Sequence, residues 1–106
     1  IRNIDVENDT VSISLYDNGI VDGDSITLIY NNEVLLTHQL LSGKPMTISL
    51  KVEAGKSNEL VMYAENLGSI PPNTALMIIY DGNNRHQVNI SSSKSTNGAV
   101  SFTLKR

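Results

Sequence analysis

Apolar and polar residues alternate with a period of two along most of this chain. The clearest case is Met46–Val52, in which the apolar side chains alternate with Thr47, Ser49 and Lys51. A period of two places successive side chains on opposite faces of a β-strand, whereas a helix needs a spacing near 3.6. The pattern therefore predicts strands with one buried and one wet face, as in antiparallel sheets.

The breaks between these runs have the chemistry of tight turns. Asn31 and Asn32 separate two strand-like runs, and Asn tolerates the positive φ angles of a type I′ hairpin. The segment Asp81–Asn84 predicts a second tight hairpin. The longest connection, Asn66–Asn73, contains Pro71 and Pro72, which cannot donate to a strand ladder.

These signals predict about eight strands in an all-β, antiparallel two-sheet sandwich, with a jelly-roll or Greek-key order or, alternatively, an immunoglobulin-like one. The expected strands are Thr10–Tyr16, Ser25–Tyr30, Glu33–Leu40, Met46–Val52, Glu59–Glu65, Thr74–Tyr80, His86–Ser91 and Ala99–Lys105. We expect residues 11–106 to form one sandwich domain and residues 1–10 to be an N-terminal segment or linker.

Two segments, Leu60–Ala64 and Ala75–Tyr80, are apolar at both parities. We expect them to be central strands that are covered on both sides or lie near another domain. Only five residues are aromatic, which predicts an aliphatic core.

Composition excludes several classes of function. The chain has 106 residues, enough for one domain. It contains no Cys, which excludes disulfides and thiolate metal sites. Its net charge is −3 and its eight Lys and Arg are scattered, which argues against nucleic acid as a partner. No apolar run approaches the ~18 residues of a membrane-spanning helix.

No catalytic pattern is recognisable either. His38 and His86 have no acidic residue at a spacing that builds a triad or a metal pair, and no Gly-x-Ser-x-Gly motif or phosphate loop occurs. We therefore predict that the chain is not an enzyme and has no catalytic residues.

The densest charged feature is the loop from Asp17 to Asp24. Asp17, Asp22 and Asp24 supply carboxylate oxygens of the kind that bind calcium, although their spacing does not match an EF-hand. The alternative is that Asp, Asn and Gly serve as turn formers between two strands.

Other candidate binding residues lie outside this loop. Asn66 and Asn73 bound the proline-containing connection, which is either a recognition loop or a packed crossover between sheets. Tyr16, Tyr63 and Tyr80 are the candidate platforms for stacking a sugar ring.

Two stretches resemble a known type of domain. DNGIVDGDSITLIYNNEVLL, from Asp17 to Leu36, and AENLGSIPPNTALMIIYDG, from Ala64 to Gly82, resemble an uncharacterised β-sandwich domain of secreted and envelope-associated proteins of Gram-negative bacteria. The resemblance implies export, an extracytoplasmic location (periplasmic, secreted or at the cell surface) and attachment to other domains of a longer protein.

The leading hypothesis is a non-catalytic accessory or interaction domain of an exported bacterial protein, with a protein or glycan partner. The alternative is a carbohydrate-binding or adhesion module, assisted by calcium through the Asp17–Asp24 loop. A third hypothesis is a structural module that assembles by pairing its exposed strand edges.

Overall fold

The predicted β-sandwich is confirmed by a computed structural model, which describes residues 2–17, 25–66, 73–92 and 98–105. The strands within these residues are β1 (Arg2–Val6), β2 (Thr10–Asp17), β3 (Ser25–Tyr30), β4 (Glu33–Leu40), β5 (Met46–Lys51), β6 (Asn58–Asn66), β7 (Asn73–Asp81), β8 (Asn84–Ser92) and β9 (Gly98–Leu104). The described part of the chain contains no helix long and apolar enough to cross a membrane.

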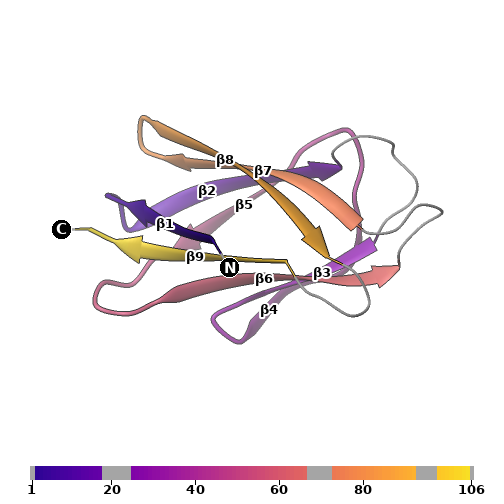
Figure 1. Cartoon of the computed structure of the whole chain (residues 1–106), viewed down its shortest axis with the longest axis horizontal. Helices are drawn as coiled ribbons and strands as arrows, with labels where there is room; N and C mark the ends of the chain where they lie inside the picture. The colour runs from indigo at the N-terminus through magenta and orange to yellow at the C-terminus, as the bar shows by residue number, and fades with distance from the viewer. Residues whose placement is uncertain (1, 18–24, 67–72, 93–97, 106) are drawn as a thin grey trace.

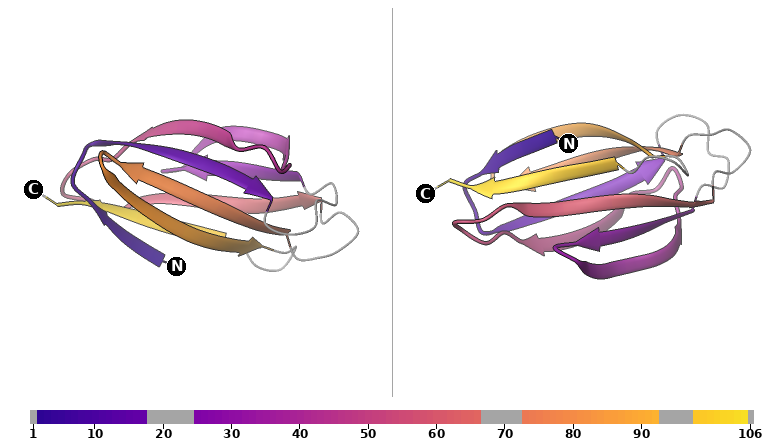
Figure 2. Two further views of the ribbon diagram at one scale, coloured as in Figure 1. Left: turned by 90° about the horizontal axis from the view of Figure 1, so that it is seen from above. Right: turned by 60° about the horizontal axis from the view of Figure 1, so that its bottom comes forward.

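The strands form two packed layers (Figures 1 and 2). One sheet has five strands in the order β1-β9-β6-β3-β4, and the other has four in the order β5-β2-β7-β8. Two hairpins, β3–β4 and β7–β8, stay within one sheet, while the other connections lead from one sheet to the other. The eight predicted strands agree with the observed ones within two residues at each end.

The N-terminal segment differs from the expectation of a linker. Residues Arg2–Val6 form β1, which pairs in parallel with β9, whereas the other strand pairs are antiparallel. Ile4 and Val6 are buried in the core. Residues 2–6 therefore belong to the sandwich. The segment offers only two alternating apolar residues, separated by Asp5, a residue type depleted from strands.

The core lies between the two sheets and is mainly aliphatic, as expected. Phe102 is fully buried within it, and Tyr30 is buried with its hydroxyl donating to the carbonyl of Lys51 at 2.7 Å. Since Tyr30 is in β3 and Lys51 in β5, this hydrogen bond joins the two sheets. β6 and β7 are interior strands of their sheets, as predicted.

One end of the sandwich is closed by tight turns. Asn31 and Asn32 have φ angles of 50° and 69°, as the predicted type I′ hairpin requires, and Gly82 has a φ of 60° in the β7–β8 hairpin. Beside the first hairpin, Asn58 is fully buried. Its amide nitrogen donates to the carbonyls of Glu53, Lys56 and Phe102, and its oxygen accepts from Glu53 N and Asn31 Nδ2.

Strand β4 is an irregular edge. Its eight residues pair with the six of β3 through two register shifts, so β4 contains two extra residues. His38 lies at the first shift with a φ of 50°, and its backbone N–H donates to Thr27 Oγ1 at 3.4 Å. The side chain of His38 is exposed at this bulge.

Candidate functional site

Of the three predicted calcium ligands, the structure describes only Asp17. It is the last residue of β2 and is 6% exposed, and its backbone N–H donates to the carbonyl of Ser42 at 2.9 Å. Asp22 and Asp24 lie outside the described residues, so the calcium site stays a prediction. Among the residues that are described, no group of three or more His, Asp or Glu is placed to hold a metal ion.

The two loops singled out in the sequence start and finish at the same end of the sandwich. Asn66 ends β6 opposite Ser25, and Asn73 begins β7 opposite Ser92. Asp17, the last residue of β2, pairs with Ala75, which lies two residues after Asn73 in β7. These strand ends lie on the right of Figure 1. The side chains of Asn66 and Asn73 are outside what the structure describes, so their proposed roles stay predictions.

The three candidate tyrosines do not form one platform. Tyr16 and Tyr80 alternate with the buried residues of β2 and β7, so both face outward from the four-stranded sheet. Tyr63 alternates with the buried Leu60 and Met62 of β6, so it faces outward from the five-stranded sheet, on the opposite surface. Any ligand that stacks on Tyr63 therefore leaves Tyr16 and Tyr80 untouched.

The outer face of β7 carries an apolar row, Leu76, Ile78 and Tyr80. Ile78 is 3% exposed although it faces away from the core, whereas Tyr80 is 44% exposed. The register places Ser14 and Gln87 on either side of Ile78. The expectation that β7 is covered on both sides is thus met at Ile78, whereas Tyr80 is exposed. The alternative, that this strand lies near another domain, stays a prediction.

The flanking strands frame this row with polar residues. Ser12 and Arg85 are the cross-strand neighbours of Tyr80, on β2 and β8 respectively. At the other end of the row, Leu76 lies between Tyr16 and Asn89. The four-stranded sheet therefore presents two tyrosines and a leucine within a polar border.

The five-stranded sheet has a pocket of about 310 Å³ on its outer face. Its lining comes from β3, β6, the residue before β6 and the Asn31–Asn32 hairpin, namely Ile29, Asn31, Asn32, Ser57, Glu59, Val61 and Tyr63. Tyr63 is 36% exposed, and Ile29 and Val61 are half-buried. The pocket thus combines an aromatic ring, aliphatic surface and polar side chains.

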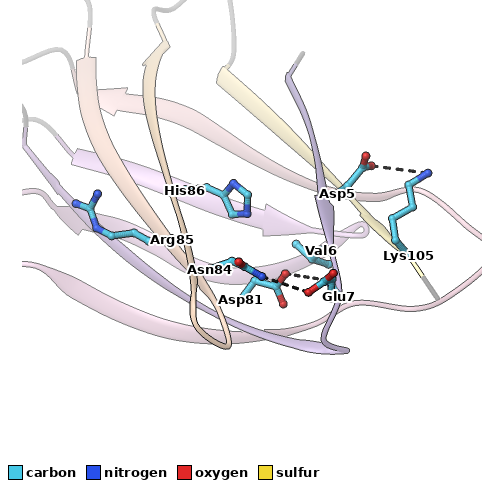
Figure 3. Close-up of a pocket in the computed structure, with 8 residues that line it drawn as sticks. All are labelled: Asp5, Val6, Glu7, Asp81, Asn84, Arg85, His86 and Lys105. Carbon is cyan, nitrogen blue, oxygen red and sulfur yellow. Dashed lines mark hydrogen bonds and ion pairs between the residues drawn. The ribbon is translucent and has the colours of Figure 1, made fainter.

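A second pocket, of about 340 Å³, lies where the edge strands β1 and β8 approach each other (Figure 3). Its lining is mostly charged, namely Asp5, Val6, Glu7, Asp81, Asn84, Arg85, His86 and Lys105. His86 points toward β1 in Figure 3, whereas Arg85 points away from it. Lys105 Nζ lies 3.9 Å from Asp5 Oδ1. Tertiary folding thus places His86 in a cleft with acidic residues that sequence spacing did not connect with it.

Asp81 in this cleft is occupied by structural hydrogen bonds. It is 1% exposed, and its carboxylate accepts from the backbone N–H groups of Glu7 and Asn8 at 2.7 and 2.9 Å and from Asn8 Nδ2 at 2.7 Å. Burial raises the pKa of Asp81, but these hydrogen bonds and the nearby His86 outweigh burial, so its pKa lies below the usual value. The sequence identified Asp81 only as a turn residue, because its partners lie more than 70 positions away.

Comparisons with protein-family models, curated proteins and solved structures gave no significant match to this chain.

Proposed function

We propose that this chain is a non-catalytic interaction domain of an exported bacterial protein, and that the outer face of the four-stranded sheet is its contact surface. The observation that carries the proposal is the exposed aromatic end of the β7 apolar row, Tyr80, beside Arg85. Tyr and Arg are enriched in protein interfaces and among the residues that dominate their binding energy. The sequence resemblance supports the extracytoplasmic location and the other domains of the full-length protein as partners.

The geometry of the cleft in Figure 3 supports a structural rather than a catalytic role for its buried acid. Both oxygens of Asp81 accept hydrogen bonds from Glu7 or Asn8, and these bonds fix the connection between β1 and β2. A carboxylate that orients a catalytic histidine must direct an oxygen at the imidazole instead.

The contact surface is tested in the full-length protein in its native host, with a photo-crosslinking amino acid at position 80 or 63. We expect a discrete crosslink from position 80 to one protein segment. Added purified domain should compete for that segment and suppress the crosslink, whereas added domain with Tyr80→Ala and Leu76→Ser should not. Crosslinking from position 63 alone would contradict the proposed surface. Turnover of ester, peptide or glycoside substrates by the purified domain, lost in His86→Ala, would contradict the non-catalytic function.

A second candidate function is carbohydrate binding, the alternative that the sequence suggested. It is favoured by the pocket of the five-stranded sheet, because sugar sites pair an aromatic or aliphatic surface with side chains that bond hydroxyl groups. This function uses the opposite surface of the sandwich, so the two candidates are separable by mutation.

A further inference from the structure

The pocket on the five-stranded sheet has a polar and an apolar end. Ile29 and Val61 are directly opposite each other in the β3–β6 register and form its aliphatic floor. Tyr63 and Glu59 lie two residues to either side of Val61 on the same face of β6. An aromatic ring therefore stands at one end of the floor, and a carboxylate stands at the other.

The polar end is held in place by hydrogen bonds that do not use the Glu59 carboxylate. Asn31 N donates to Glu59 O at 3.0 Å, and Glu59 N donates to Asn31 Oδ1 at 2.8 Å. Asn31 Nδ2 donates to the buried Asn58 at 3.2 Å. The hydroxyls of Ser57 and Ser101 are 2.9 Å apart. These contacts fix the hairpin backbone, while the side chains of Asn32 and Glu59 are exposed at the rim.

This arrangement matches the chemistry of a pyranose ring. Such a ring has a face of C–H groups that packs on an aromatic or aliphatic surface, and hydroxyl groups at its edge that bond to carboxylates and amides. The volume of about 310 Å³ is at the lower limit for small-molecule sites. Tyr63 lies four positions after Glu59 along the strand, a span of roughly 13 Å, which suits one or two sugar rings.

Charge restricts the ligand further. Among the described residues that line this pocket, Glu59 is the one ionisable group apart from the Tyr63 phenol, and the whole chain carries a net charge of −3. An acidic sugar would therefore place its carboxylate near a like charge, which is unfavourable. The polar end thus selects hydroxyl donors over anions.

We propose that this pocket binds a neutral hexopyranose residue of a glycan, stacked on Tyr63 and bonded through its hydroxyls to Glu59 and Asn32. The proposal rests on the second candidate function, carbohydrate binding, and names its site and its class of ligand. It also assigns the sugar site to Tyr63 rather than to Tyr16 or Tyr80.

The test is an NMR titration of the ¹⁵N-labelled domain with methyl β-glucopyranoside, methyl β-galactopyranoside and methyl α-mannopyranoside, each to tens of millimolar. We expect at least one glycoside to shift the amide signals of Ile29, Asn32 and Val61. Tyr63→Ala should weaken the affinity about threefold to tenfold because the stacking surface is removed. Tyr63→Phe should keep it within about twofold, because the ring remains.

Matched variants separate the site from the function. Tyr80 is an exposed tyrosine on the opposite face, so Tyr80→Ala should leave the glycoside affinity unchanged. Glu59→Ala should lower the affinity without altering the amide signals of the Asn31–Asn32 hairpin. Binding that is lost in Tyr80→Ala but kept in Tyr63→Ala would overturn this site and leave carbohydrate binding in place. If none of the three glycosides shifts any signal, both this site and carbohydrate binding are overturned. That result would not contradict the proposed interaction surface on the four-stranded sheet. Equal affinity for methyl β-glucuronide would overturn the restriction to neutral sugars.

Discussion

The carboxylate of Asp81 accepts a hydrogen bond from the backbone N–H of Glu7 at 2.7 Å. Glu7 directly follows β1 of the five-stranded sheet, and Asp81 ends β7 of the four-stranded sheet. Asn8 donates two further hydrogen bonds to this carboxylate. Asp81 therefore holds the β7–β8 hairpin of the four-stranded sheet against the segment that follows β1 of the five-stranded sheet. The contact also fixes the connection that leads from β1 into β2.

Removing this carboxylate should destabilise the fold. We expect Asp81→Ala to lower the free energy of unfolding by about 2 to 4 kcal/mol, because two part-buried backbone N–H groups lose a charged acceptor. Urea denaturation at pH 7 measures the change. Asp5→Ala is the control. The Asp5 carboxylate forms an exposed ion pair with Lys105 and accepts an exposed hydrogen bond from Asn3 Nδ2, so its removal should change stability by less than about 1 kcal/mol. Equal losses of stability for the two substitutions would contradict the stabilising role of the Asp81 hydrogen bonds.

The same carboxylate predicts a dependence on acidic pH. The pKa of Asp81 is lower in the folded protein than the unfolded value of about 3.9, so its ionised form favours folding. Its contribution is complete above about pH 4 and is lost as the pH falls through the lower, folded-state pKa. Unfolding curves between pH 2 and pH 5 should therefore decline more steeply for the wild type than for Asp81→Asn. Parallel declines would contradict the lowered pKa.

Asn58 should be the least replaceable polar residue of the hairpin end. Its side chain is fully buried and bonds the turn before β6, the Asn31 amide and the carbonyl of Phe102. We expect Asn58→Ala to lower the free energy of unfolding by about 2 to 4 kcal/mol, since one buried and several part-buried groups lose their partners together. The exposed Asn84, which makes one bond of 3.3 Å to Glu7, is the matched control. A loss below 1 kcal/mol for Asn58→Ala would mean that water replaces the amide.

Tyr30 predicts a loss of stability at alkaline pH. Burial, and then the charge of Glu53, raise the pKa of Tyr30 to about 12, against a smaller lowering by the Asn31 side chain. The protonated phenol therefore stabilises the fold fully below pH 10, and this contribution is lost as the pH rises from 10 through 12, by about 2 to 3 kcal/mol. The difference between wild type and Tyr30→Phe in chemical denaturation measures it. A constant difference across this range would contradict the raised pKa.

The two residues of the β3–β4 turn should respond in opposite directions to glycine. Asn32 has a φ of 69°, so Asn32→Gly should be neutral or stabilising by up to about 1 kcal/mol. Asn31 also has a positive φ, but its side chain bonds Asn58 and Glu59 N, so Asn31→Gly should destabilise by about 1 to 2 kcal/mol. Thermal unfolding of both variants tests the pair, and two shifts of the same sign would refute it.

Local patterns were sufficient wherever the determinant lies within a few residues. Alternation located β3 and β4 with their observed bounds, and the Asn31–Asn32 pair predicted its turn type. Strand β1 was not predicted, because it forms by pairing with β9, about a hundred positions away in the sequence, rather than through its own composition. The bulge at His38 was not predicted for a related reason, since a register shift depends on the pairing of two strands and not on the sequence of one.

The candidate sites divide in the same way. Tyr16 lies at the opposite parity to Val11, Ile13 and Leu15, which by itself indicates that it faces outward. Composition limited the sugar platforms to a few tyrosines. Only the pairing of β6 with β3 brought Ile29 next to Val61 and the Asn31–Asn32 hairpin next to Glu59. Only the packing of the two sheets placed Tyr63 and Tyr80 on opposite surfaces. The sequence by itself thus determined the strands and turns, because side-chain alternation and turn angles are set by near neighbours. The tertiary structure decided which residues meet, because contacts between distant strands depend on sheet order and register, which no local pattern encodes.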